Sequence, residues 1–153
     1  MKFNIRNAKI TDAYKIRSIL KKYGQEADII IRPLNDIYEN LRDFKVIEYK
    51  NQIIGTIALH IYWNDLAEIR SFVIEKKYRD KGLGQLLLNE AIKEAKKIGI
   101  KKIFALTKIP KFFIKNGFKK ISRKKLPQKI WKDCLLCPKY PNYCDEQGVI
   151  KRI

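Results

Sequence analysis

The chain has 153 residues, an apolar fraction of 46% and a formal net charge of +18 at pH 7. This length allows one domain with a sizeable core and excludes two independent domains, and the apolar fraction excludes a disordered chain. No apolar run in the sequence approaches the roughly 20 residues that span a bilayer, and the N-terminus carries no hydrophobic signal core. We therefore expect a globular, cytoplasmic protein.

The basic residues are mostly lysines spread along the chain in pairs, such as Lys21-Lys22, Lys76-Lys77 and Lys101-Lys102. A positive charge of this size attracts polyanions, whether nucleic acid, acidic lipid or a multiply charged cofactor. Dispersed pairs are also typical of solvated faces, and we favour that interpretation over a dedicated nucleic-acid surface.

The N-terminal region is predicted to begin with a short strand over residues 3–5. Thr11 or Asp12 is placed to cap a helix that extends to about Tyr23, and Gly24 is expected to close it.

The next segment contains a short helix from Asn35 through Arg42, followed by a hairpin of two strands over residues 44–49 and 53–62. His60, the only histidine, lies in the second strand. We interpret it as a packed or solvated strand residue rather than as a catalytic base.

Residues 67–98 have the pattern of a strand, a loop with almost no side chains and an amphipathic helix. The loop reads Arg79-Asp80-Lys81-Gly82-Leu83-Gly84. Its glycines let the backbone approach a ligand, and the first N–H groups of the helix lack intrahelical acceptors at the positive end of the helix dipole. A pyrophosphate fits there, with mobile positive charge from Arg79 and Lys81, while Asp80 can serve the helix start.

Two glycines at this spacing are also compatible with a simple tight turn, and the loop has neither the third glycine of a dinucleotide-binding fingerprint nor a Gly-Lys-Ser/Thr sequence. Arg79, Gly82 and Gly84 do occupy the three fixed places of the pattern Gln or Arg, two residues, Gly, one residue, Gly or Ala. The stretch thereby resembles motif A of the GNAT superfamily of N-acetyltransferases. The resemblance implies acetyl-coenzyme A as co-substrate, with its pyrophosphate on residues 79–84.

The remaining elements are a strand over residues 103–107, a short helix over 109–116 and a strand over 118–122. Their order resembles the GNAT fold over residues 3–122, which implies an α/β protein with a mixed, mostly antiparallel central sheet flanked by helices. By the same resemblance, the pantetheine arm pairs with the strand backbone at Phe72, Val73 and Ile74.

The strand before the glycine loop carries the candidate chemistry. Strict alternation would place Glu68, Arg70 and Phe72 on one face and Ile69, Ser71 and Val73 on the other. An ammonium acceptor must lose a proton before it attacks a thioester, and Glu68 is our candidate general base, with partial burial raising its pKa. An ion pair with Arg70, which would keep Glu68 ionised, is the alternative.

An N–H near Phe72 or Val73 could stabilise the oxyanion of the tetrahedral intermediate. Many family members offer a tyrosine as the acid that protonates the leaving thiolate. The corresponding stretch here contains Phe112 and Phe113 instead. This departure puts the common tyrosine mechanism in doubt.

Several segments resemble the short, stand-alone N-acetylglutamate synthases of arginine biosynthesis, namely residues 32–34, 40–44, 104–107, 112–118 and 126–131. This resemblance implies L-glutamate as acceptor, with Arg32 and Arg70 binding its carboxylates and Arg6 and Arg42 as second choices. One rival is acetylation of a protein N-terminus, a lysine or a polyamine. The other rival is a non-catalytic nucleic-acid-binding module.

We divide the chain into an acetyltransferase domain, residues 1–126, and a C-terminal extension, residues 127–153, which packs on the domain or on a second subunit of a homodimer. The extension contains Cys134, Cys137 and Cys144. Three cysteines fall short of a closed four-ligand zinc site, so we favour reduced thiols over metal ligands or a disulfide, and expect no metal.

Overall fold

The structure is a computed structural model that describes residues 2–27, 32–122, 125–126 and 147–153. The elements are β1 (Asn4–Asn7), η1 (Ile10–Asp12), α1 (Ala13–Ala27), α2 (Leu34–Glu39), η2 (Leu41–Asp43), β2 (Phe44–Tyr49), β3 (Gln52–Ile61), β4 (Leu66–Ile74), η3 (Lys76–Tyr78), α3 (Leu83–Lys97), β5 (Lys102–Thr107), α4 (Pro110–Lys115), β6 (Lys119–Ile121) and β7 (Gln147–Arg152). The three η elements are single 3-10 turns.

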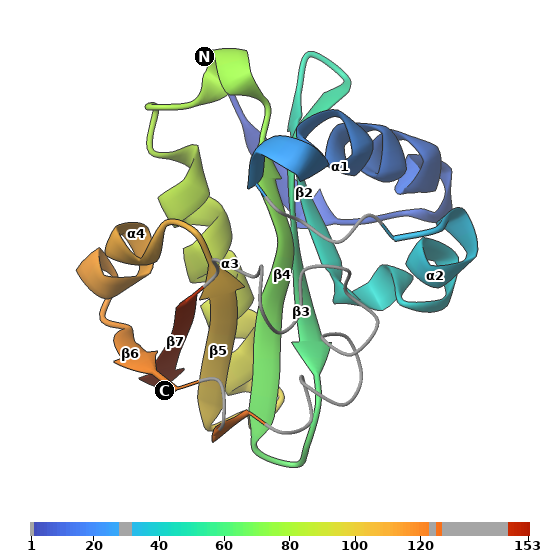
Figure 1. Ribbon diagram of the computed structural model, residues 1–153. Helices are drawn as coiled ribbons and strands as arrows, with labels where there is room; N and C mark the ends of the chain where they lie inside the picture. The colour runs from blue at the N-terminus through green and yellow to red at the C-terminus, as the bar shows by residue number, and fades with distance from the viewer. Residues whose placement is uncertain (1, 28–31, 123–124, 127–146) are drawn as a thin grey trace.

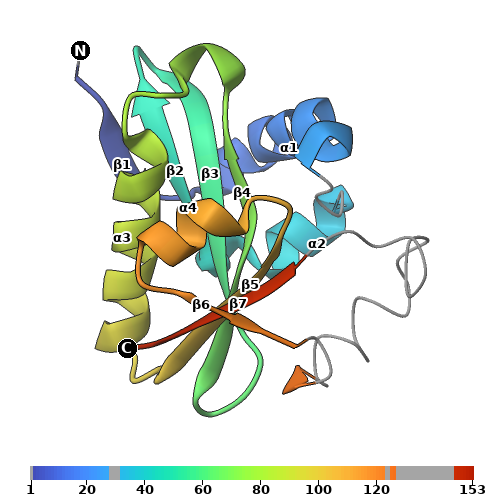
Figure 2. The same ribbon diagram turned by 60° about the vertical axis from the view of Figure 1, so that its left-hand side comes forward.

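The strands form one sheet in the order β1-β2-β3-β4-β5-β7-β6. Every neighbouring pair is antiparallel except β4 and β5, which run parallel. Helices α1 and α2 cover one face of the sheet, while α3 and α4 cover the other (Figures 1 and 2). The predicted mixed, mostly antiparallel sheet flanked by helices is confirmed.

Each face of the sheet has its own apolar core. On one face α3 buries residues three or four positions apart, including Leu83, Leu87 and Ala91, against β3 and β4. On the other face α1 buries Ile16 and Leu20 in the same spacing. Among the described residues, no helix combines the length and apolarity needed to cross a membrane.

Helix α1 is longer than predicted, because it passes Gly24 and continues to Ala27. Glycine inside a helix costs about 1 kcal/mol relative to alanine, which tertiary contacts can outweigh. One such contact is the hydroxyl of buried Tyr23, which accepts a hydrogen bond of 3.1 Å from the main-chain N–H of Lys76. The end of α1 is therefore held by the segment that follows β4.

Strand β7 was not predicted, and it corrects the boundary of the proposed C-terminal extension. Residues 147–152 lie inside the sheet, paired with β5 on one side and with β6 on the other. A Cβ on Gly148 would stand 2.8 Å from the main-chain oxygen of Ile121, so glycine permits the close approach of β6. The three cysteines lie outside the described residues.

Candidate active site

The sheet opens between its two parallel strands. They are paired only at Leu66 with Lys102, Ala67 with Ile103 and Glu68 with Phe104. Beyond that point β5 continues beside β7, and β4 continues to Ile74 beside β3. Within the described part of the chain, the edge of β4 that faces this opening has no strand partner after Glu68, so its main-chain groups can bind an extended ligand.

A β-bulge bends β4 at the opening. Thr56 pairs with Val73 and Ala58 with Arg70, so Ser71 and Phe72 together stand opposite one residue of β3, Ile57. Ser71 has a φ of 51°, an uncommon conformation for a residue other than glycine. Such backbone strain persists where the surrounding structure enforces it, often at functional sites.

The bulge reverses the alternation of side chains, which corrects one prediction. Before the bulge, Ile69 packs on the α3 side; after it, Phe72 does so, and Val73 packs on the α1 side. Phe72 therefore lies on the face opposite to Glu68 and Arg70, not on the same face as predicted. Strict alternation failed because the extra residue shifts the period of the strand by one.

The ring of Phe72 joins an aromatic cluster between β4 and α4. Its centroid lies 5.8 Å from that of Phe112 and 6.3 Å from that of Phe113. Ile74 packs on the same side, whereas the side chain of Val73 is buried in the α1 core, so Val73 can offer a ligand only its main chain.

The glycine loop leads directly into α3. Gly82 is the N-cap with a φ of 77°, and no atom lies within 4 Å of the position where a Cβ would stand. Leu83 is buried, so it presents only its N–H, and a Cβ on Gly84 would make ordinary contacts of 3.7 Å with Phe72 and Phe112. Open space and the unbonded N–H groups of the first helical turn fit a pyrophosphate.

Two of the three charged residues of the loop, Arg79 and Asp80, differ from the sequence-based expectation. Arg79 is fixed rather than mobile: its Nε donates to the main-chain oxygen of Ile74 at 2.9 Å, and its guanidinium lies 5.1 Å from the ring centroid of Tyr23. Asp80 does not cap α3, because the N-cap is Gly82, which makes no side-chain cap bond; Asp80 instead has a φ of 65°. Lys81 is exposed.

Glu68 and Arg70 lie together on the α1 side of β4. The Glu68 residue is 2% exposed, and its Oε1 is 4.0 Å from Nη1 of Arg70, the long limit of an ion pair. The same Nη1 donates a hydrogen bond of 3.2 Å to the hydroxyl of Tyr62. The arginine is thus beside the carboxylate without a close charge-assisted hydrogen bond through this nitrogen.

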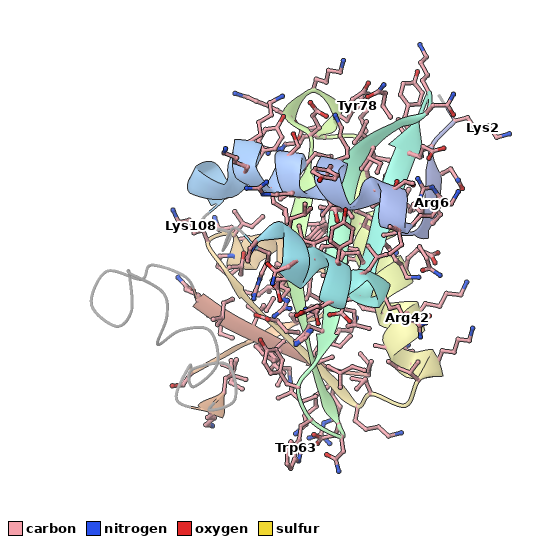
Figure 3. All side chains as sticks on the ribbon, turned by 90° about the vertical axis from the view of Figure 1, so that its right-hand side faces the viewer. Lys2, Arg6, Arg42, Trp63, Tyr78 and Lys108 are labelled. Carbon is pink, nitrogen blue, oxygen red and sulfur yellow. The ribbon has the colours of Figure 1, made fainter. Side chains whose placement is uncertain are left out.

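The other candidate arginines are spread over the molecule. Arg32 precedes α2, where its Nη1 is 3.7 Å from Oδ2 of Asp36. Arg6 is a structural residue, because its guanidinium binds Asp12 at 2.7 Å and Glu48 at 2.8 Å. These hydrogen bonds raise the pKa of Arg6 and lower that of Asp12. Arg42 is exposed on η2, on the α1 and α2 face seen in Figure 3.

Sequence reasoning missed two polar groups near the opening. His60 is buried, as expected for a packed strand residue, but its Nδ1 lies 2.6 Å from Oδ2 of Asp43. The hydroxyl of Thr107, at the end of β5, accepts a hydrogen bond of 2.9 Å from the N–H of Ile109. A turn centred on Asn64 places His60 opposite Glu68 on the two strands that it joins, and this symmetry is the signal that could have grouped His60 with the proposed base.

Helix α4 carries phenylalanines where the expected acid would lie, as the sequence indicated. Among the residues that the structure describes, no group of three or more His, Cys, Asp or Glu side chains is arranged to hold a metal ion.

The sequence is similar to a protein family and to several curated proteins. The Acetyltransferase (GNAT) family profile matches residues 12–118. An uncharacterized N-acetyltransferase of Chlorobaculum tepidum is 40% identical over 149 residues, 97% of this chain and 96% of that protein. The amino-acid acetyltransferase of Mycobacterium tuberculosis is 27% identical over 120 residues, 76% of this chain and 68% of that protein. That of Vibrio vulnificus is 32% identical over 125 residues, 80% of this chain but only 28% of that enzyme.

Two solved structures share the fold over nearly the whole chain. N-acetylglutamate synthase from Neisseria gonorrhoeae, complexed with coenzyme A and N-acetyl-glutamate, superposes with a TM-score of 0.87 at 24% identity, covering 99% of this chain and 35% of that chain. A Mycobacterium tuberculosis protein in complex with coenzyme A gives a TM-score of 0.84 at 22% identity, covering 98% and 99%.

Proposed function

The chain belongs to the acetyltransferase (GNAT) family and is an acetyl-coenzyme A-dependent N-acetyltransferase, and on that premise we propose that it acetylates the α-amine of an amino acid, most favourably L-glutamate. The observation that carries the proposal is the position of Glu68. This buried carboxylate stands at the last paired position before the sheet opens, beside a guanidinium.

The co-substrate would lie in the opening, with its pyrophosphate on the N–H groups that follow Gly82 and its pantetheine arm along the free edge of β4. Phe72 and Phe112 form an apolar wall there. The thioester would then end near the bulge at Ser71, where main-chain N–H groups of β4 can donate to a developing oxyanion.

Glu68 accepts one proton from the acceptor's ammonium group, and the neutral amine attacks the thioester carbonyl to form a C–N bond. When the intermediate collapses, the C–S bond breaks and the nitrogen gives up a second proton, which balances the proton taken up by the leaving thiolate. The products are an amide, coenzyme A and one proton. No acyl-enzyme forms in this scheme.

The preference for an amino acid rests on the arginines and on the relatives. Arg70 lies on the same face as Glu68, and Arg32 lies at the start of α2 on the side of the sheet that Glu68 faces. A guanidinium binds a carboxylate with two parallel hydrogen bonds. The relatives from Mycobacterium and Vibrio are named amino-acid acetyltransferases, which favours an amino acid as acceptor. The choice of glutamate, and with it a role in arginine biosynthesis in the cytoplasm, rests on the sequence resemblance to the N-acetylglutamate synthases.

The test is a thiol-release assay with acetyl-coenzyme A and a panel of acceptors: the amino acids, a polyamine, a lysine-containing peptide and peptides with free N-termini. We expect turnover with L-glutamate, little with D-glutamate, and a raised KM for glutamate in Arg70→Met with the affinity for coenzyme A unchanged. Turnover of peptides or polyamine without turnover of any amino acid would overturn the proposal. Salt-sensitive nucleic-acid binding by a protein inert in every acceptor assay would favour the non-catalytic rival.

A further inference from the structure

We infer that His60, held by Asp43, carries the proton from Glu68 to solvent after each acetyl transfer, an inference that rests on the proposed role of Glu68 as base. The starting point is a requirement of the chemistry. Each turnover leaves one proton on a carboxylate that is 2% exposed, and that proton must leave before the next acceptor can be deprotonated.

The strand register brings the imidazole to the carboxylate. His60 of β3 and Glu68 of β4 are directly paired in the antiparallel ladder. Paired residues project from the same face of a sheet, with their Cβ atoms about 4.5–5.5 Å apart. The two side chains are therefore neighbours, on the face where the acceptor is proposed to bind.

Asp43 determines how the imidazole is used. Its Oδ2 lies 2.6 Å from Nδ1 of His60, so in the neutral ring Nδ1 carries the hydrogen and donates it to the carboxylate. The other ring nitrogen, Nε2, is then the proton acceptor. An imidazole oriented by a carboxylate on its far side is suited to take up a proton and to stabilise the resulting positive charge.

The side chains become more exposed along this route. Side-chain exposure is 3% for Glu68, 11% for His60 and 22% for Asp43. The ring of Tyr62 packs edge-on against His60 with centroids 4.9 Å apart, and its hydroxyl accepts the hydrogen bond from Arg70. Among the described residues, the charged or titratable groups around His60 are Asp43 from η2, Tyr62 from β3, and Glu68 and Arg70 from β4.

The transfer is balanced at each step. The O–H bond of protonated Glu68 breaks as an N–H bond forms at Nε2, which yields a carboxylate and an imidazolium paired with Asp43. The imidazolium then gives its Nδ1 proton through the carboxylate of Asp43 to water, and exchange with water moves the remaining hydrogen from Nε2 back to Nδ1. Glu68 is again a carboxylate and His60 again neutral, and no other reactant is consumed.

Two substitutions at His60 separate proton transfer from packing. His60→Gln can still donate a hydrogen bond to Asp43 but cannot carry a proton, whereas His60→Ala leaves room for added imidazole. For both variants we expect kcat with the best acceptor to fall at least about tenfold, a modest share of a general base's contribution. KM for acetyl-coenzyme A should stay unchanged, and the pH profile of kcat should lose a limb. Imidazole should restore kcat in His60→Ala.

Asp43→Asn should give a smaller loss of kcat, because the imidazole remains but its partner is neutral. Thr56→Val is the matched control: Thr56 is buried on the same strand, and its hydroxyl has no hydrogen-bond partner among the described residues. It should keep both kcat and the pH profile.

An unchanged pH profile in His60→Gln, with kcat within twofold of the parent, would overturn the relay. Failure of imidazole to restore kcat in a folded His60→Ala would do the same. If His60→Ala does not fold, the pH profile of kcat for His60→Gln is the deciding measurement. The proposed function fails differently: the parent enzyme would then show no turnover of amino acids, whereas failure of the relay leaves that turnover intact.

Discussion

Glu68 and Phe104 form the last pair between the parallel strands β4 and β5. The main chain of Glu68 is therefore paired on both sides, with β3 and with β5. The residues that follow Glu68 on β4 pair with β3 alone among the described strands, which leaves their other edge open. A rigid carboxylate and an open binding edge are thus adjacent in the sequence. The bulge at Ser71 lies three residues further and turns Phe72 toward the other face of the sheet.

Because of the bulge, we expect position 71 to tolerate glycine but not valine. Valine is strongly disfavoured at a positive φ, whereas glycine adopts it freely. We expect Ser71→Val to lower the free energy of unfolding by about 1–3 kcal/mol and to reduce acetyl transfer. Ser71→Gly should keep both within experimental error. Denaturant unfolding and the thiol-release assay check this, and a stable, fully active valine variant would show that the bulge is dispensable.

The glycine loop can be tested without disturbing its backbone. Asparagine tolerates the left-handed conformation of Gly82 better than other residues, so Gly82→Asn should retain the fold but put a side chain into the open space above α3. We expect the Kd for coenzyme A to rise at least about tenfold, 1.4 kcal/mol, by calorimetry.

Gly84→Ala is the control for that variant. Its added methyl group makes only ordinary contacts with Phe72 and Phe112, and alanine favours a helix by about 1 kcal/mol over glycine. The melting temperature should hold or rise, with coenzyme A affinity close to that of the parent. Equal loss of affinity in both variants would speak against a specific role for the space above Gly82.

Tyr23 connects α1 to the loop that would hold the pyrophosphate. Its hydroxyl binds the N–H of Lys76, and its ring lies under the guanidinium of Arg79. Tyr23→Phe removes the first contact and Tyr23→Leu removes both. We expect the leucine variant to bind coenzyme A roughly fivefold more weakly than the phenylalanine variant, because a cation–π contact contributes about 1 kcal/mol. Equal affinities of the two variants for coenzyme A would show that Arg79 does not depend on its contact with the Tyr23 ring.

The ion pair between Arg6 and Asp12 predicts a pH-dependent stability. The hydrogen bond from Arg6 lowers the pKa of Asp12 in the folded protein below its ordinary value of about 3.9. The carboxylate therefore stabilises the fold at pH values above that ordinary pKa, and the contribution is lost as the pH falls through the lower folded pKa. Asp12→Asn should lose roughly 1–3 kcal/mol at pH 7 and much less in strong acid.

Glu48→Gln provides the comparison, since Glu48 binds the same arginine but is more exposed. It should cost less than Asp12→Asn in urea unfolding at pH 7. A stability difference for Asp12→Asn that does not change between pH 7 and pH 2 would contradict the assignment.

The glycine loop and the order of elements up to β6 could be predicted because their signals are local. A strand, two closely spaced glycines and an apolar helical period occur within 32 consecutive residues, 67–98. Predicting the full seven-stranded sheet, in contrast, depends on recognising β7. The short sequence of β7 does not distinguish a strand from a surface segment. Its place between β5 and β6 depends on partners 27 to 50 positions away in the sequence.

The site was only partly predictable for the same reason. Glu68 and Arg70 are two residues apart on one strand, and the structure brings them together as alternation requires. The face on which Phe72 lies was predicted wrongly, because the bulge that interrupts the alternation of side chains depends on pairing with β3 and not on the sequence of β4. Asp43 and His60 are 17 positions apart and meet only because η2 ends beside β3.

The central claim, that Glu68 removes the acceptor's proton, is tested most directly by kcat of Glu68→Gln with acetyl-coenzyme A and L-glutamate. Glutamine preserves the size of the side chain and removes its basicity. The account predicts that kcat falls by about 100-fold or more while the Kd for coenzyme A stays within twofold of the parent. A glutamine variant that turns over at the rate of the parent enzyme would contradict it.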